Sequence, residues 1–174
     1  MSSSLCLSND FEIRKKFSLS GSFKLEIQEF SLKLKLEEKL NLPLCKGKYF
    51  RFLVKLGNKS GIPLPKHEKL KLEAKLFTSV KPHREITHSM NGSEIFKGSK
   101  FAELVYDEKA NTHIASFKLQ ISDVSSHFSG FNLAVHVHEN EFLQNVGLMI
   151  KPLLVKDILV MSKERICQKL RLSK

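Results

Sequence analysis

The residues of this chain that could do chemistry are seven histidines, three cysteines and several runs of lysine and arginine. The closest approach to a metal motif is His136-Val137-His138, because residues two apart on a strand project from the same face. No third ligand accompanies this pair in the sequence. We therefore interpret both histidines, with Asn132 and Ala134, as the solvent-facing side of a strand, and we place the other histidines, including His113, in loops.

Catalytic motifs with a recognisable local pattern are missing from the sequence. There is no GxSxG, no GxxxxGK[ST] and no HExxH, and the glycines stand singly instead of forming a phosphate-binding loop. The cysteines form no CxxC pair and are odd in number, which favours reduced thiols. We predict a non-enzyme with no catalytic residue, metal or cofactor, whereas a pocket that groups His136 or His138 with a carboxylate would favour an enzyme with a dispersed site.

Basic side chains are the main functional signal, and they are unevenly distributed along a chain of formal net charge +11. Residues 46–84 carry 11 basic and 2 acidic side chains, residues 85–150 carry 4 and 8, and residues 151–174 carry 7 and 2. Phosphate groups of nucleic acid are natural partners for such clusters. The candidate contact residues are Lys46, Lys48, Arg51, Arg84, Arg165 and Arg171.

Each basic cluster also has a purely structural interpretation. Lysines on the solvent side of strands protect exposed sheet edges from aggregation, and this role is about as common as phosphate binding. The basic C-terminal segment could contact phosphates, act as a nuclear address or simply be solvated. The sequence leaves these alternatives open, and it does not show that the two basic segments share one face.

The elements that would position these residues are mainly strands. Apolar residues alternate with polar ones at Phe50 to Leu56, Leu70 to Leu76, Ala115 to Ile121 and Phe131 to Val137, with turn residues between the runs. Residues 23–36 alternate with one phase change, which indicates a bulge or two strands, and 101–106 and 154–161 are further candidates. Ser162 is placed to cap a short helix or tail after it.

Length and composition favour one domain. A chain of 174 residues with 41% apolar residues can bury a core without disulfides or metals. We predict a flexible leader at 1–10, a β-sandwich domain at 11–162 and a basic tail or short helix at 163–174. The N-terminus lacks the pattern of a secretory signal and no stretch is long enough for a transmembrane segment, so we expect an intracellular protein, nuclear or cytoplasmic.

The strands over 117–137, followed by Ile150-Lys151-Pro152 and 157–163, resemble the closing strands of immunoglobulin-like domains in eukaryotic regulatory proteins. The resemblance is one of pattern, covers roughly residues 48–163 and contains no DNA-contact motif. It implies an all-β, immunoglobulin-like Greek-key β-sandwich of seven to nine strands. Such domains bind nucleic acid or proteins, so no residue role transfers.

Two binding hypotheses follow. The first is a regulatory module that binds DNA or RNA, whose affinity falls steeply with salt and weakens on charge reversal at Arg51 and Arg84. The second is a protein-interaction sandwich that recruits a partner through an exposed edge strand or through Ile62, Leu64 and Phe128. A membrane-surface role has less support, because no amphipathic anchor is evident.

Overall fold

The protein is mainly β in a computed structural model that describes residues 32–58, 64–138 and 140–172. This confirms the all-β class expected from the alternating sequence. The strands are β1 (Leu32–Leu36), β2 (Leu44–Cys45), β3 (Tyr49–Asn58), β4 (Leu70–Thr78), β5 (Phe96–Ser99), β6 (Phe101–Asp107), β7 (Thr112–Ile121), β8 (Phe131–Val137), β9 (Ile150–Lys151), β10 (Leu153–Ile158) and β11 (Val160–Met161). The helices are the 3-10 helix η1 (Ser125–Phe128), α1 (Glu141–Val146) and α2 (Lys163–Leu172).

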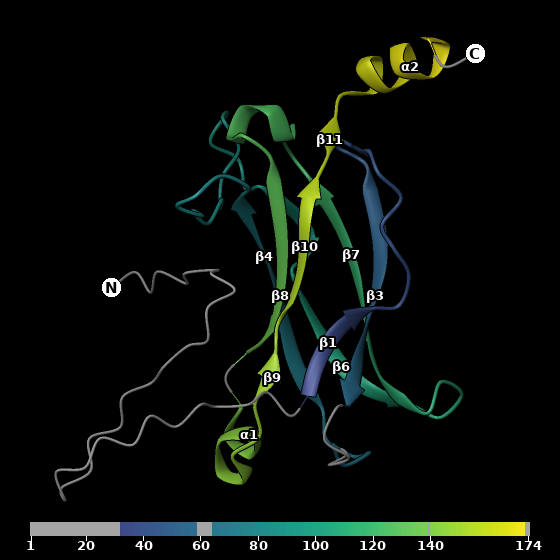
Figure 1. Cartoon of the computed structure of the whole chain (residues 1–174), viewed down its shortest axis with the longest axis vertical. Coiled ribbons are helices and arrows are strands. Elements are labelled where there is room, and N and C mark those ends of the chain that lie inside the picture. The colour runs from purple at the N-terminus through teal and green to yellow at the C-terminus, as the bar shows by residue number, and fades with distance from the viewer. Residues whose placement is uncertain (1–31, 59–63, 139, 173–174) are drawn as a thin grey trace, which may run out of the picture.

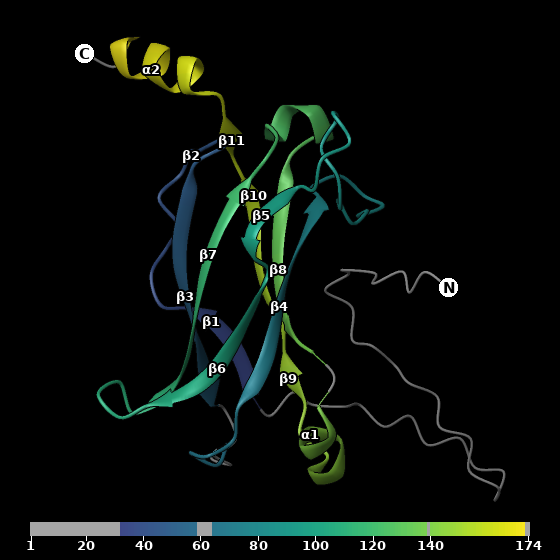
Figure 2. The ribbon, with the colours of Figure 1, turned by 180° about the vertical axis from the view of Figure 1, so that it is seen from behind.

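Nine strands form a single sheet that is nearly closed into a barrel. Its order is β10-β8-β4-β6-β7-β3-β1-β9, and β5 pairs with β7 off this path. The first and last strands of the order, β10 and β9, are separated along the chain by Pro152 alone, so the chain itself links the two ends of the sheet. Figures 1 and 2 show the curved sheet from opposite sides.

The two ends of the barrel carry different elements. β2 and β11 pair in parallel at one end, and α2 follows β11 there and projects from the barrel (Figure 1). The short helix α1 lies at the opposite end (Figure 1). The β2–β11 pair therefore ties the start of β3 to the start of α2, which are distant in the sequence.

The core follows the alternation read from the sequence. The inward residues of β4 are the clearest case, since Leu70, Leu72, Ala74 and Leu76 are all at most 1% exposed. On β7 and β8 the expected inward residues are also buried, from Phe117 to Ile121 and from Phe131 to Val135. Because successive side chains of a strand point to opposite faces, this burial fixes which residues lie on the outer face of the sheet.

The expectation that Asn132 and Ala134 face solvent is wrong. Both are buried, although they alternate with the core residues Phe131, Leu133 and Val135 and so lie on the outer face of β8. The Asn132 side-chain oxygen accepts hydrogen bonds from Ser79 Oγ (3.3 Å) and from the Asp157 N–H (3.0 Å). A polar side chain on the outer face is therefore enclosed by Ser79, which directly follows β4, and by the end of β10.

Histidine 113 also differs from its expected loop position. It lies on β7, is 4% exposed, and its Nε2 is 3.2 Å from the Pro65 carbonyl oxygen. Burial lowers the pKa of His113, and the hydrogen bond to the Pro65 carbonyl opposes this only in part. The ring is thus a packed element of the fold.

Helix α2 confirms the expected C-terminal helix, and the Arg165 N–H lies 3.4 Å from the capping oxygen of Ser162. The alternation did not indicate the two-residue strands β2 and β9, strand β5 or helix α1. The predicted leader at 1–10 and the first half of the predicted strand pair, at 23–27, lie outside the described residues.

Candidate nucleic-acid interface

The outer face of strands β3, β7 and β5 carries the clearest cluster of unpaired basic side chains. In the register of these strands Arg51 stands opposite Lys118, and Lys118 stands opposite Ser99. The next row joins Tyr49 to Gln120 and Gln120 to Lys97. We call these two rows the basic face; its residues are Tyr49, Arg51, Lys97, Ser99, Lys118 and Gln120.

The orientation of the basic face follows from what its strands bury. Phe52 of β3 and Phe117 of β7 stack in the core with ring centroids 5.0 Å apart. Their neighbours along the strands, Arg51 and Lys118, must then point outward, and both are exposed. Cross-strand pairing places the two cations side by side, which costs repulsion unless an anion or water lies between them.

No carboxylate among the described residues forms an ion pair with Arg51, Lys97 or Lys118. The partner of Lys118 is instead an aromatic ring, since its Nζ lies 5.1 Å from the ring centroid of Tyr49. Tyr49 is 53% exposed. The basic face therefore combines cations that are free for an anionic ligand with an aromatic surface suited to stacking.

Gly98 shapes the β5 side of the basic face. Its φ is +95°, and a Cβ there would stand 2.4 Å from the Lys118 carbonyl oxygen and 3.2 Å from Tyr49 Cε1. Only glycine combines this backbone conformation with such close approach. Gly98 thereby lets the Tyr49 ring lie against β5.

The structure brings four of the predicted contact residues to one side of the barrel. Arg51 belongs to the basic face, and Lys48 directly precedes its Tyr49. Lys46 stands two residues before Lys48. With Arg165 of α2, it lines a hollow at the end of the barrel where β3 begins.

Arg84 and Arg171 lie elsewhere. Arg84 follows β4, where its N–H donates to Thr78 Oγ1 at 3.0 Å, and β4 pairs with β6 and β8, away from β3. Arg171 is in the last turn of α2. The sequence analysis missed the other five residues of the basic face, Tyr49, Lys97, Ser99, Lys118 and Gln120.

A buried carboxylate organises the end of the barrel next to the basic face. Asp123 is 2% exposed, accepts hydrogen bonds from the Met90 and Val124 N–H groups and from His127 Nδ1, each at 2.8 Å, and lies 3.6 Å from Lys46 Nζ. Burial alone would raise the pKa of Asp123, but these donors and the Lys46 charge outweigh it and lower the pKa.

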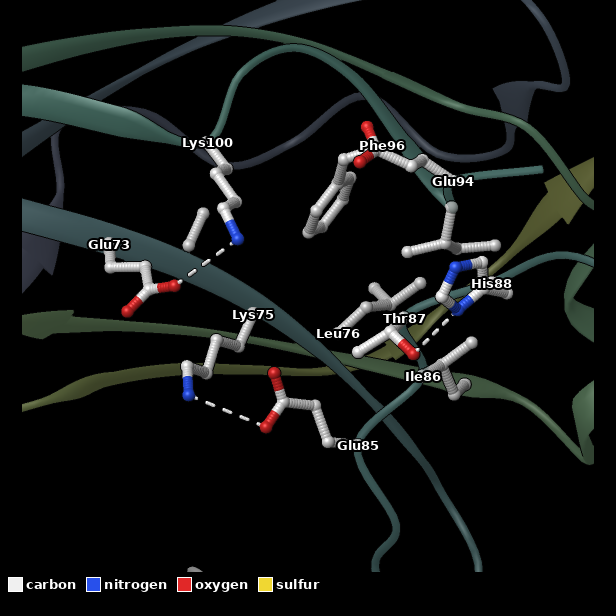
Figure 3. Close-up of a pocket in the computed structure, with 12 residues that line it drawn as sticks. Glu73, Lys75, Leu76, Glu85, Ile86, Thr87, His88, Glu94, Phe96 and Lys100 are labelled. Atoms are coloured by element: carbon white, nitrogen blue, oxygen red, sulfur yellow. Dashed lines mark hydrogen bonds and ion pairs between the residues drawn. The ribbon is translucent and has the colours of Figure 1, made fainter. Parts of the chain in front are cut away.

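A second charged cluster lies on the other side of the barrel, around β4 (Figure 3). Glu73 lies 3.6 Å from Lys100 Nζ and 3.4 Å from His136 Nε2, and Lys75 lies 3.4 Å from Glu85. Glu73 lines a cavity of about 130 Å³ with Lys75, Glu85 and Lys100. Burial lowers the pKa of His136, and the Glu73 charge opposes that effect.

Within residues 32–58, 64–138 and 140–172, no cluster of three or more His, Cys, Asp or Glu side chains could hold a metal ion. His138 packs edge-on against Phe101, with ring centroids 6.0 Å apart, and does not join His136 in a shared site. Cys45 and Cys167 are free thiols. No described helix has the length and apolar character needed to span a membrane.

Two of the three loop residues proposed for protein recruitment lie in the described part of the chain, and neither is fully exposed. Leu64 is 5% exposed and belongs to the core, and Phe128 packs against Phe131. Ile62 lies outside the described residues.

No protein-family model matches this chain, and no curated protein matches it.

Proposed function

We propose that this protein is a non-catalytic binding module whose basic face contacts the phosphates of nucleic acid. The observation that carries the proposal is the pair of cross-strand rows on β3, β7 and β5, in which Arg51, Lys97 and Lys118 have no acidic partner among the described residues. Cations without an acidic partner are available to phosphate oxygens, and their binding releases the counterions condensed on the polyanion.

Tyr49 favours single strands as the ligand. Its ring is 53% exposed and lies amid the cations of the basic face. Bases can stack on such a ring only where they are unpaired, and each stacked base contributes about 1–3 kcal/mol. A single strand that follows β3 would thus meet cations for its phosphates and an aromatic surface for its bases.

The test is fluorescence anisotropy with single-stranded DNA, RNA and duplex DNA over a salt series. If Lys48, Arg51, Lys97 and Lys118 each neutralise one phosphate, log Kobs against log salt has a slope of about −3 for a single strand. Affinity then falls roughly 50-fold between 50 and 200 mM salt. Absent or salt-independent binding overturns the proposal.

A paired set of variants locates the binding face. The double variant Arg51→Gln/Lys118→Gln removes two of the four cations, so its salt slope becomes shallower by about 1.4. Lys69→Gln removes an exposed lysine that directly precedes β4, away from the basic face, and serves as the control. A wild-type slope in the double variant contradicts the assignment of the basic face.

Protein binding is the second candidate, and the edge of β3 supports it. The pairing of β1 with β3 gives way after the Glu37 N–H donates to the Leu53 carbonyl at 2.9 Å. Beyond that point a hollow of about 520 Å³ separates segment 37–41 from β3 and reaches Arg51 and Leu53, and Leu53 is 42% exposed. A stoichiometric protein partner that survives high salt would favour this alternative.

The non-enzyme interpretation is retained as part of the proposal. His136 does pair with a carboxylate that lines a cavity, which is the arrangement that would favour a dispersed active site. Here each carboxylate has a lysine partner, since Glu73 lies 3.6 Å from Lys100 and Glu85 lies 3.4 Å from Lys75, and the non-enzyme interpretation assigns both to these pairs. The cluster is accounted for as a set of ion pairs that link β4 to its neighbours.

The finer points of the sequence interpretation belong to the same proposal. An immunoglobulin-like Greek-key arrangement, a regulatory role and a nuclear or cytoplasmic location all fit a nucleic-acid-binding β domain. Binding of nucleic acid is the step on which the regulatory role and the location depend, and it is therefore tested first.

A further inference from the structure

A hollow of about 230 Å³ lies at the end of the barrel next to the basic face and is lined by three separate segments. The turn between β2 and β3 contributes Lys46, the region of η1 contributes Ser126 and His127, and the start of α2 contributes Arg165. Two cations, an imidazole and a hydroxyl thus converge from parts of the chain up to about 120 residues apart. Val124 and Ser162 complete the lining.

Hydrogen bonds between the three segments build this hollow. The Lys46 N–H donates to the Met161 carbonyl at 2.8 Å, which joins the β2–β3 turn to the residue before Ser162. Ser125 Oγ exchanges hydrogen bonds with the Val160 carbonyl (3.3 Å) and N–H (3.2 Å), so η1 is joined to β11 in the same way. Ser125 and Val160 are both buried, and the positions of the lining residues are therefore set by the fold.

The local charge balance favours an anion. Asp123 is the buried carboxylate beneath the hollow, and it offsets one of the two positive charges of Lys46 and Arg165. Its hydrogen bond to His127 Nδ1 leaves the other ring nitrogen for a ligand. The charges of Lys46, Arg165 and Asp123 sum to +1. Glu164 of α2 does not line the hollow; hydrogen bonds with backbone N–H and Ser162 lower its pKa.

We propose that this hollow binds a phosphate monoester, and that the ligand is the terminal phosphate of the nucleic-acid strand held by the basic face. The chain runs from Lys46 through Lys48 to Tyr49, so Lys46 in the hollow and Tyr49 in the second row of the basic face are at most roughly 11 Å apart along the backbone. A terminal phosphate carries nearly two negative charges, against one for a phosphate within the strand, and it therefore gains more from Lys46 and Arg165. This inference rests on the proposed function.

The test compares one oligonucleotide sequence with a 5′-phosphate, a 3′-phosphate or hydroxyl ends, at equal salt. We expect one of the phosphorylated strands to bind about tenfold more tightly than the hydroxyl strand, which corresponds to one or two charge-assisted hydrogen bonds. Arg165→Gln abolishes this preference, so that it binds the phosphorylated and hydroxyl strands equally well. Arg171→Gln, on the same helix but outside the hollow, keeps the preference and controls for the loss of one charge from α2.

A second readout separates failure of this inference from failure of the proposed function. Inorganic phosphate is titrated into the full chain while the His127 ring resonances are followed by NMR, and we expect them to shift in wild type and not in Arg165→Gln. Equal binding of all three strands, with no His127 shift, overturns the terminal-phosphate site and leaves the basic face intact. A saturable His127 shift without binding of any strand overturns the proposed function and its terminal-phosphate extension but retains the hollow as a phosphate site.

Discussion

Asp123→Asn is the substitution that most sharply tests how the end of the barrel beside the basic face is held together. Asp123 Oδ1 accepts hydrogen bonds from the Val124 N–H and from His127 Nδ1, and it lies 3.6 Å from Lys46 Nζ. Its other oxygen, Oδ2, accepts the Met90 N–H at 2.8 Å. Both carboxylate oxygens are therefore in use, and the side chain is 3% exposed.

Asparagine cannot reproduce this set of bonds, because it has one acceptor oxygen and a donor NH₂ group. If the asparagine oxygen keeps the hydrogen bonds from Val124 and His127, its NH₂ group faces the Met90 N–H. Two donors then meet without an acceptor, which costs about 1–3 kcal/mol of unfolding free energy. Loss of the negative charge weakens the remaining bonds by a further ~1 kcal/mol. We expect the free energy of unfolding at pH 7 to fall by about 2–4 kcal/mol.

The same substitution changes the pH dependence of stability. Burial raises the pKa of Asp123, but its hydrogen bonds and Lys46 lower the pKa overall, so the folded-state value lies below the unfolded-state value of about 3.9. The stabilisation by Asp123 is then complete above the unfolded-state pKa and is lost as the pH falls through the folded-state pKa. The stability difference between wild type and Asp123→Asn should therefore shrink from pH 7 to pH 3.

Urea unfolding followed by circular dichroism at several pH values measures both effects. Asp107→Asn is the matched control, because one oxygen of Asp107 accepts both the Lys109 and Ala110 N–H groups, at 2.8 and 3.0 Å. Asparagine can keep both bonds there, and we expect a loss under about 0.5 kcal/mol. The account is refuted if Asp123→Asn costs no more than Asp107→Asn at pH 7.

Three further predictions concern stability. Gly98→Ala should cost about 2–4 kcal/mol in urea unfolding, because its Cβ meets the Lys118 carbonyl at a φ of +95°, whereas Gly92→Ala, at +76° with open space around it, should cost only about 1 kcal/mol. Asn132→Ala should cost about 1–3 kcal/mol by leaving the Asp157 N–H unpaired, and an unchanged urea midpoint would contradict this. Burial lowers the pKa of His113, so its stabilisation is complete above pH 6.5 and declines as the pH falls below it; His113→Gln should show a flatter stability profile between pH 7 and 5.5.

The sequence predicted which face of each main strand is buried, because burial on a pleated strand repeats every two residues. Phe52 and Phe117 were assigned inward on that basis, and both lie in the core. The same rule failed at Asn132, because alternation describes one strand and does not show what covers its outer face. The hydrogen bonds from Ser79 and Asp157 that enclose Asn132 come from segments 53 and 25 residues away.

The candidate interface was predictable only in part for a related reason. Arg51 and Lys48 stand out as members of a local basic run, whereas Lys118 is an isolated lysine in an acidic part of the chain. Its place beside Arg51 depends on the pairing of β3 with β7, which joins residues 67 positions apart. Cross-strand register between distant segments is not encoded in local periodicity, so Lys97 and Lys118 could not be found from spacing alone.

The most direct test of the basic face compares charge reversal at two exposed arginines, both suggested by the sequence as nucleic-acid contacts. Arg51 lies on the basic face beside Lys118, and Arg84 lies beyond the end of β4, away from the basic face. Anisotropy with single-stranded DNA at 50 mM salt should show that Arg51→Glu weakens binding by about tenfold or more, while Arg84→Glu stays within about twofold of wild type. Equal losses in the two variants, or a loss confined to Arg84→Glu, would contradict the assignment of nucleic-acid binding to this face.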